Sequence, residues 1–429
     1  MKTMSDQGFA TKAVHAGEAP DPVTGSRATP IHQTTSYQFQ DAGHAARLFG
    51  LQEFGNIYTR IQNPTQGALE GKIAALEGGT AALAVASGHA AQALVAHTLM
   101  EAGDEIVAAK QLYGGSLNQF TQAFAKFGWG VKLVDGTSPE NFKAAISEKT
   151  RFIFTESLAN PGGIVMDLEA IARIAADAKL PYVVDNTLAS PYLIRPLEWG
   201  ANIVVHSLTK FIGGHGNAIG GVIVDGGNFD WKASGKYPSL TQPSGSYHGM
   251  VLNDVFGPMG ISFAIAARVL GLRDLGAAIS PFNAFLILTG AETLHLRMQR
   301  QSDNALGVAK WLKAHAKVGW VSYAGLESDP FHALARKYAP KGAGAVLTFG
   351  LKGGYEAGVK FVNGLKLFSH LANIGDVRSL AIHPASTTHS QLPDADKVAA
   401  GAGPDVVRLS VGIEDLADIT ADLDQALNA

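Results

Sequence analysis

The sequence predicts an α/β fold whose larger domain contains a mostly parallel sheet, and three observations support this prediction. Short, mostly apolar runs recur at residues 81–86, 105–109, 130–134, 151–155, 181–185, 202–206 and 219–224. Amphipathic segments separate the earlier runs, at residues 89–101, 116–127, 139–148 and 167–178. The composition, 46% hydrophobic and 17% charged, is that of a chain that buries a large core. Fully apolar strands that alternate with helices are typical of a parallel sheet covered on both faces.

The 429 residues divide into three regions. Residues 1–60 are polar and rich in turn residues, which predicts an extended N-terminal arm rather than a layer of the core. Residues 61–280 contain the alternating pattern, and it begins with a helix at 66–77 that Gly78 is placed to end. Residues 281–429 open with a long helical pattern at 281–316 and then mix short strands and helices, which predicts a smaller C-terminal α+β domain.

Charge and composition exclude several classes of function. The formal net charge of −3 gives no electrostatic reason to bind nucleic acid or an anionic membrane. The chain has no cysteine, so disulfides, thiolate nucleophiles and cysteine-ligated zinc are excluded. No apolar run reaches the roughly 18 residues of a membrane span, and the N-terminus lacks the apolar segment of a secretory signal. We expect a cytoplasmic protein without a metal site.

A lysine lies in the turn after a predicted strand, in the run Val204-Val205-His206-Ser207-Leu208-Thr209-Lys210. Most lysines are solvated, so a lone lysine after a strand is ordinarily interpreted as a solvent-exposed side chain. The alternative is that Lys210 forms a Schiff base with an aldehyde cofactor, as enzymes dependent on pyridoxal 5′-phosphate (PLP) require. Ser207 and Thr209 belong to the same turn and are placed to hydrogen-bond a phosphate group.

Three further features at strand ends have the chemistry that PLP needs. Asp185 ends an apolar strand and can pair with the pyridine nitrogen, or it caps a turn. Ser87-Gly88-His89 joins a strand to a helix, where the amides of Gly88 and His89 can bind a phosphate; many tight turns look similar. Tyr113 follows another strand and can stack on the pyridine ring, or it is structural. Ligands of open α/β sheets bind beyond the carboxyl ends of the strands, where all these residues are expected.

The ordered set of motifs resembles the PLP-dependent enzymes of Cys/Met metabolism over nearly the whole chain. This family includes cystathionine γ-synthase, cystathionine γ-lyase, methionine γ-lyase and the acylhomoserine sulfhydrylases. The resemblance implies the aspartate-aminotransferase-like fold, known as fold type I. The motifs are Tyr58-Thr59-Arg60, Asn63-Pro64-Thr65, Ser87-Gly88, Tyr113-Gly114-Gly115, Glu156-Ser157, Asn160-Pro161, Asp185-Asn186-Thr187, Ser207-Leu208-Thr209-Lys210 and Arg408-Leu409-Ser410-Val411-Gly412.

The resemblance also implies roles for residues that spacing alone does not single out. Tyr58 and Arg60 correspond to the pair that reaches the cofactor phosphate of a neighbouring subunit. Active sites shared within dimers, usually in a homotetramer, follow from that. Asn160 corresponds to the residue beside the PLP 3-hydroxyl. Arg408 corresponds to the arginine that binds the substrate α-carboxylate, for which a planar guanidinium is suited, and Ser379 to a residue beside that carboxylate.

Within the family, the chain most resembles the O-acetylhomoserine sulfhydrylases, also called acetylhomoserine aminocarboxypropyltransferases. Methionine γ-lyases typically carry a cysteine where this chain has Gly115. The implied reaction is γ-replacement, in which sulfide or methanethiol displaces acetate from O-acetylhomoserine to give homocysteine or methionine. Lys210 would move protons at the α- and β-carbons, and Tyr113 or Tyr58 would protonate the leaving group. Cystathionine γ-synthase, O-succinylhomoserine sulfhydrylase and γ-lyase activities remain alternatives. The supporting stretches are residues 29–37, 280–285 and 383–392.

Other classes of protein fit the sequence less well. The glycine-rich run 213–220 invites a nicotinamide-binding fingerprint, but the third glycine of that pattern falls at Ile219 and the run does not open a helix after a strand. A metal hydrolase is disfavoured because the chain has no His-Glu-x-x-His pattern. A non-catalytic PLP-binding protein has no need for Arg408 beside Lys210 and Asp185.

Overall fold

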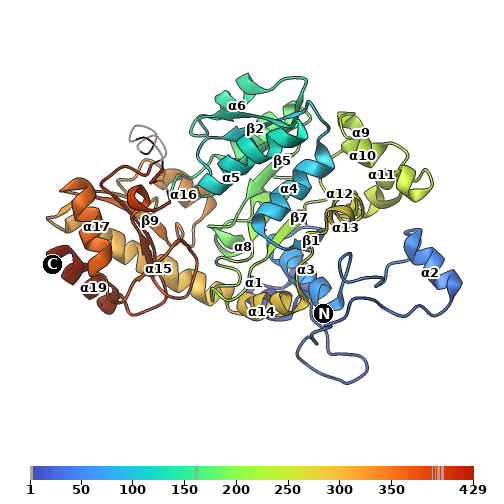
Figure 1. The fold of residues 1–429 in the computed structure, drawn as a ribbon, viewed down its shortest axis with the longest axis horizontal. Coiled ribbons are helices and arrows are strands. Elements are labelled where there is room, and N and C mark those ends of the chain that lie inside the picture. Colours follow the sequence, from blue (N-terminus) through green and yellow to red (C-terminus); the bar gives the residue numbers. More distant parts are fainter. Residues whose placement is uncertain (1–2, 160–162, 389, 392, 394–396, 398–400) are drawn as a thin grey trace.

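The computed structural model describes residues 3–159, 163–388, 390–391, 393, 397 and 401–429. Two sheets, one of seven strands and one of five, form the centres of two packed bodies (Figure 1). The larger body has helices on both faces of its sheet, and the smaller one lies at the C-terminal end of the chain. The predicted α/β fold with a smaller α+β part is therefore confirmed.

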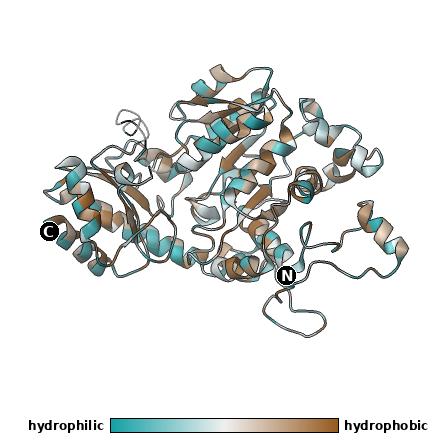
Figure 2. Ribbon diagram, viewed as in Figure 1, coloured by the Kyte–Doolittle hydropathy of each residue, from teal (hydrophilic) through white to brown (hydrophobic). Residues whose placement is uncertain are grey.

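The seven-stranded sheet contains every apolar run that the sequence predicted as a strand. Its order is β1-β7-β6-β5-β4-β2-β3, and only β7 runs antiparallel to its neighbours. Most of these strands are buried along their length, and Figure 2 shows them as largely hydrophobic ribbons. The strands are β1 (Ala81–Val85), β2 (Glu105–Ala109), β3 (Gly130–Val134), β4 (Thr150–Glu156), β5 (Tyr182–Asp185), β6 (Ile203–Ser207) and β7 (Gly221–Asp225).

The helices before and between these strands begin and end where the sequence gives physical signals. Asn63 caps the first of them by accepting a hydrogen bond from the Thr65 amide, and Gly78 ends it with a φ of 82°. The predicted helix at 116–127 is only partly regular. The α-helical part ends at Asn118. A wider π-helical turn and then a tighter 3₁₀ turn follow it, and they bury Phe120 and Phe124. These helices are α3 (Pro64–Glu77), α4 (Gly88–Leu99), α5 (Gly114–Asn118), α6 (Glu140–Ala145) and α7 (Leu168–Asp177).

The long helical pattern at 281–316 is two helices. Thr293 ends the first and begins the second, with φ and ψ of −100° and 7°. No described helix is long and apolar enough to cross a membrane. The helices after β5 are α8 (Ser190–Leu193), α9 (Trp231–Ser234), α10 (Pro238–Thr241), α11 (Leu252–Phe256), α12 (Ser262–Ala266), α13 (Arg273–Leu275), α14 (Pro281–Glu292) and α15 (Leu294–Ala314).

The five-stranded sheet has its own hydrophobic core, which includes Leu347, Phe349 and Val407. Its order is β10-β11-β12-β9-β8; β10 and β11 are parallel and the other pairs are antiparallel. Helix α15 packs on this sheet and also contacts α8 of the larger body. Its elements are β8 (Val318–Ser322), α16 (His332–Tyr338), β9 (Val346–Leu351), α17 (Gly354–Gly364), β10 (Ser369–His370), β11 (Leu380–Ile382), β12 (Val406–Ser410) and α19 (Leu416–Asn428).

The N-terminal region is only partly an extended arm. Helix α1 (Phe9–His15) packs against α3. Lys72 of α3 is fully buried; its ammonium lies 2.7 Å from the Glu18 carboxylate and donates to the Ala13 carbonyl at 2.8 Å. Helix α2 (Ala42–Phe49) projects from the rest of the chain, as Figure 1 shows, and Phe49 is 59% exposed there. The segment beyond Glu18 therefore corresponds to the predicted arm, whereas α1 belongs to the packed body.

Candidate active site

A cavity of about 200 Å³ lies at the carboxyl ends of β5 and β6, where ligands of open α/β sheets bind. The turns after β1 and β2 close one side of it, and β12 of the smaller body closes another. The residues singled out from the sequence that line this cavity are Ser87, Gly88, His89, Tyr113, Asp185, Ser207, Thr209, Lys210 and Arg408. The fold thus brings together residues that are up to 321 positions apart, at the carboxyl ends of the strands where the site was predicted.

Lys210 extends into this cavity from the turn that follows β6. Its ammonium nitrogen Nζ donates to Asn373 Oδ1 at 2.5 Å. Burial disfavours the charged form and the positive charge of Arg408 adds to the effect, so the pKa of Lys210 falls from 10.5 to about 8. A lysine with a lowered pKa in a cleft is a candidate nucleophile or base, because more of its amine is neutral near pH 7.

Asp185 lies at the end of β5 with its carboxylate held at two points. Its Oδ1 accepts from the Thr187 amide at 2.9 Å, and its Oδ2 accepts from Gln92 Nε2 at 3.1 Å. The Thr187 hydroxyl in turn accepts from the Ser207 amide at 2.8 Å, which ties the turn after β5 to the end of β6. The carboxylate and the Lys210 turn are therefore fixed relative to one another.

The amino terminus of α4 faces the same cavity. Ser87 caps this helix by accepting from the Ala90 amide at 3.1 Å. Gly88 lies against β6, and a Cβ there would be 2.9 Å from the Ser207 Cβ. On the neighbouring strand, a Cβ on Gly221 would be 2.0 Å from the Ser87 carbonyl oxygen. Only glycine fits at these two positions, and the result is a helix N-terminus beside a hydroxyl group, which suits an anion.

The Thr209 hydroxyl is engaged with the loop before β7. It accepts from the Gly220 amide at 3.1 Å and lies 3.3 Å from the Gly220 carbonyl oxygen. The turn that carries Lys210 is thereby attached to β7 as well as to β5. An oxygen lone pair of Thr209 remains for a further donor, because a hydroxyl has two.

Tyr113 places a half-exposed ring at the mouth of the cavity. Its backbone amide donates to Glu156 Oε1 at 2.5 Å, and its ring lies 6.0 Å from the His89 ring at an angle of 35°. A Cβ on Gly115 would be 2.3 Å from a carbon of the Tyr113 ring. The ring keeps this position only because residue 115 has no side chain.

Arg408 brings the smaller body to the cavity from β12. Its Nη2 donates to the Asn373 carbonyl at 3.3 Å. Burial lowers the pKa of Arg408 to about 10, while Tyr113 acts in the opposite direction. The guanidinium therefore stays cationic at neutral pH and presents a fork of donors that matches a carboxylate.

Of the other residues predicted for the site, the three that the structure describes do not line this cavity. Ser379 is fully buried, donates to Glu414 Oε2 at 3.0 Å and accepts from the Gly412 amide at 2.9 Å. Tyr58 and Arg60 lie in the arm, where the guanidinium is 5.4 Å from the tyrosine ring centroid and donates to a carbonyl at the start of α13. Asn160 lies outside the described residues.

Several cavity residues carry no role in the sequence analysis, and three of them contact residues that do. Glu156 ends β4 directly beside Asp185, so the strand-end rule that selected Asp185 would have found it. Gln92 lies one turn inside α4 and only interrupts an apolar stretch. Asn373 lies in a loop before β11, and nothing in the local sequence marks it. Their position depends on the tertiary fold.

A buried hydrogen-bond network supports the sheet behind the site. His206 Nε2 lies 2.6 Å from Glu77 Oε1, which also accepts from Asn186 Nδ2 at 2.9 Å. Asn186 Oδ1 accepts from the Ser157 hydroxyl at 2.7 Å. All four side chains are fully buried. They join α3 to the ends of three adjacent strands, so the turns that carry Asp185 and Lys210 start from a rigid base.

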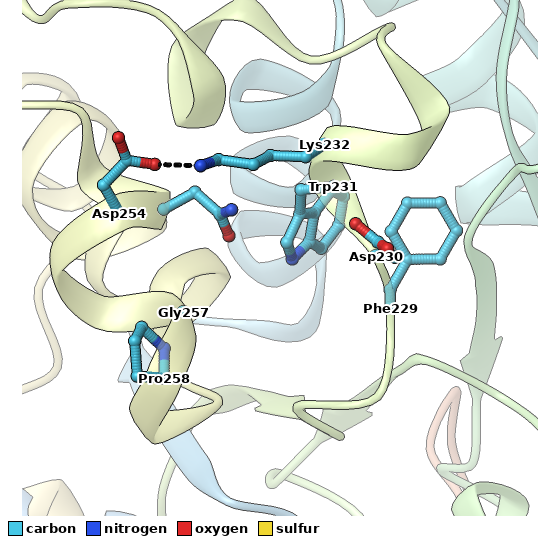
Figure 3. A pocket seen from close by; sticks show the side chains of 8 residues that line it. Phe229, Asp230, Trp231, Lys232, Asp254, Gly257 and Pro258 are labelled. Atoms are coloured by element: carbon cyan, nitrogen blue, oxygen red, sulfur yellow. Dashed lines mark ion pairs between the residues drawn. The ribbon is translucent and has the colours of Figure 1, made fainter.

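A second hollow, of about 390 Å³, lies on the surface beside α9 and α11 (Figure 3). It contains an ion pair between Lys232 Nζ and Asp254 Oδ1, at 2.6 Å, and both side chains are more than half exposed. The third charged residue there, Asp230, caps α9 by accepting from the Ala233 amide at 3.0 Å. In the part of the chain that the structure describes, no group of three or more His, Asp or Glu side chains is arranged to hold a metal ion.

The first cavity has the groups that PLP requires. Lys210 supplies an amine with a lowered pKa, and Asp185 supplies a fixed carboxylate for the pyridine nitrogen. The N-terminus of α4 and the Ser207 hydroxyl suit the phosphate, because unpaired helix amides attract anions. The donors of this chain therefore fit the group.

Comparison with known proteins finds relatives over nearly the whole chain. A family model described as Cys/Met metabolism PLP-dependent enzyme matches residues 10–428. The O-acetyl-L-homoserine sulfhydrylase of Leptospira meyeri is 55% identical over 424 residues, which cover 97% of this chain and 96% of that protein. O-acetyl-L-homoserine sulfhydrylase 1 of Thermus thermophilus is 53% identical over 421 residues, covering 98% and 99%.

A solved structure is similar over the same extent. The Campylobacter jejuni protein assigned as an O-acetylhomoserine (thiol)-lyase, with N′-pyridoxyl-lysine-5′-monophosphate, matches with a TM-score of 0.95 and 38% identity. The match covers 99% of this chain and all of that one. The fold and the chain length are thus shared with a protein whose lysine carries the cofactor.

Proposed function

Because the chain belongs to the Cys/Met metabolism PLP-dependent enzymes, we propose that it catalyses γ-replacement on O-acetyl-L-homoserine. Sulfide or methanethiol takes the place of acetate on the γ-carbon, which gives L-homocysteine or L-methionine. The observation that carries this proposal is the convergence of Lys210, Asp185 and Arg408 on one cavity. An amine, a carboxylate and a guanidinium are the groups that bind PLP and the carboxylate of an amino acid.

In this proposal, residues from four strand ends hold the cofactor. PLP, when bound, supplies an electron sink next to the reacting carbons of an amino acid. Lys210 attaches it, and Asp185 pairs with its pyridine nitrogen. The ring of Tyr113 stacks on it at the mouth of the cavity. The phosphate is bound by Ser87, Gly88, His89, Ser207 and Thr209.

Lys210 is then also the base of the reaction. Its Nζ removes the α-proton of the bound amino acid and later a β-proton, so that the γ-substituent can leave. Burial and Arg408 support this role, because they lower the pKa of the amine to about 8 and keep part of it neutral near pH 7. Asn373 Oδ1, 2.5 Å away, accepts from the amine and limits where it can move.

Arg408 binds the substrate α-carboxylate with its planar guanidinium. Tyr113, half exposed at the mouth, donates a proton to the leaving acetate, and Tyr58 of a neighbouring subunit is the alternative donor. We assign Asn160 to the PLP 3-hydroxyl and Ser379 to the substrate carboxylate. The Ser379 assignment requires its hydroxyl to turn away from Glu414.

We further propose a homotetramer whose active sites are shared within dimers. Tyr58 and Arg60 do not line the cavity of their own chain, and they follow α2, the helix that projects from the body in Figure 1. Such an arm can deliver both side chains to the phosphate site of a second copy. Of the predicted arm at residues 1–60, we assign this role to the segment beyond Glu18, and we place the PLP-binding domain at 61–280 and the C-terminal domain at 281–429, in a cytoplasmic enzyme.

The substrate choice is tested with a matrix of acyl esters and thiols. Acetyl-, succinyl- and phosphohomoserine are each assayed with sulfide, methanethiol and cysteine, and kcat/KM is measured for every pair. We expect acetylhomoserine with sulfide to give the highest value. A preference for cysteine would instead identify a cystathionine γ-synthase, and release of 2-oxobutanoate without any thiol would identify a γ-lyase.

A further inference from the structure

We propose that Gln92 is a positioning residue for the cofactor, whose side-chain amide holds the Asp185 carboxylate in the orientation that receives the pyridine nitrogen. The inference rests on the proposed role of Asp185. It concerns a residue whose type and position in the sequence suggested only an interruption of an apolar helix.

The contacts of Gln92 link three elements around the cavity. The side chain lies on α4, is 5% exposed and belongs to the cavity lining. Its Nε2 donates to Asp185 Oδ2 at 3.1 Å and to the Ser116 hydroxyl at 3.0 Å. An amide nitrogen has two protons, so both are used by these two contacts. Ser116 lies on α5, which begins directly after Tyr113.

The orientation of the amide follows from the chemistry of its partners. An ionised carboxylate only accepts hydrogen bonds, so the NH₂ group and not the oxygen of Gln92 must face Asp185. The Gln92 Oε1 is buried and, among the described residues, has no hydrogen-bond partner. Leaving a buried oxygen without a donor costs free energy, so the contacts made by Nε2 outweigh that cost. Asp185 thus determines how Gln92 is oriented.

Gln92 in turn determines how the Asp185 carboxylate is oriented, and this is its proposed role in cofactor binding. The Asp185 carboxylate is held at Oδ1 by the Thr187 amide and at Oδ2 by Gln92. Rotation of the carboxylate about its Cβ–Cγ bond would break one of these bonds. A carboxylate has about four acceptor sites, and two remain for a ring N–H. A partner that orients a functional group in this way prepares it for its ligand before the ligand binds.

A binding experiment with two cofactors separates this role from simple packing. Apoenzyme is prepared for the wild type, for Gln92→Leu and for Gln111→Leu, and Kd is measured by equilibrium dialysis. The ligands are PLP and 1-deaza-PLP, in which a CH group replaces the ring nitrogen. Gln111 is the matched control, because its Nε2 also donates to an aspartate, Asp135, at 2.8 Å, but it does not line the cavity.

We expect Gln92→Leu to raise the Kd for PLP about tenfold, which is the loss of one hydrogen bond to a charged group. Its Kd for 1-deaza-PLP should stay within about twofold of the wild type, because that ligand has no ring N–H for Asp185. Gln111→Leu should change neither value. In an Asp185→Ala background, Gln92→Leu should have no further effect on PLP binding.

Two results would overturn the proposal. An unchanged Kd for PLP in Gln92→Leu would show that the contact does not matter, and an equal rise for both ligands would show a packing role. If Gln92→Leu does not fold, Gln92→Met, which has nearly the same length and no amide, replaces it under the same criteria. The comparison needs no amino-acid substrate, so it is independent of which acyl ester the enzyme uses.

Discussion

The pKa of Lys210 makes the capture of PLP by the apoenzyme depend on pH in a defined way. Burial, and secondly Arg408, lower this pKa from 10.5 to about 8. With a lowered pKa, the reactive neutral amine is already populated at pH values below those at which an ordinary lysine deprotonates. At pH 7 its neutral fraction is roughly one in ten, against roughly one in 3,000 for an unperturbed lysine. The structure therefore predicts an advantage of about 300-fold in neutral amine at that pH.

The assay follows the rate at which apoenzyme captures PLP, by visible absorbance between pH 6 and 10.5 in buffers without amines. The same rates are measured in parallel with free Nα-acetyl-lysine. This control shows how much of the pH dependence comes from the titration of PLP itself. We expect the enzyme's rate to rise with pH and to level off above about 8. Arg408→Met should move the inflection to higher pH, because it removes the positive neighbour. An inflection at or above 10 in the wild type would refute the reasoning.

Three further predictions test other parts of the structure. Glu77→Leu leaves two buried donors without an acceptor, so it should lower the free energy of unfolding by about 3 kcal/mol in urea titrations; an unchanged midpoint would contradict the buried network. Arg408→Ala should lower kcat/KM for acetylhomoserine about 100-fold while the bound-PLP absorbance persists. A small loss of kcat/KM would contradict the assignment of Arg408 as the residue that binds the substrate carboxylate. Mixing inactive Arg60→Ala and Lys210→Ala chains should restore about a quarter of wild-type activity, since half of randomly assorted dimers are hybrids with one intact site. No recovery in demonstrated hybrids would exclude shared sites.

Local pattern predicts most of the larger sheet. Its strands are short and most of them are buried on both faces, so each one is an apolar run with turns at its ends. The break at Thr293 escaped prediction, because the helical pattern continues through it and only its backbone angles end α14. The position of α1 escaped for a different reason. A polar, turn-rich sequence predicts an arm, whereas the buried Glu18–Lys72 pair fastens this region to α3.

Some residues of the cavity can likewise be predicted from the local sequence, whereas others are placed only by the tertiary fold. Asp185 and Lys210 follow from a rule about strand ends, since parallel strands deliver their carboxyl ends to one edge. Arg408 lies on a different sheet, and only the resemblance to a family pointed to it. Gln92 and Asn373 have no local signal, because their contacts with Asp185 and Lys210 exist only after distant segments pack together.

The attachment of PLP to Lys210 is tested most directly by reduction and peptide mapping. The holoenzyme is treated with borohydride and digested, and the peptides are sequenced by mass spectrometry; Lys210→Ala is treated in the same way. We predict a pyridoxyl phosphate adduct on Lys210 in the wild type and no reducible adduct in the variant. An adduct on another lysine, or one that persists in Lys210→Ala, would contradict the assignment of this cavity as the active site.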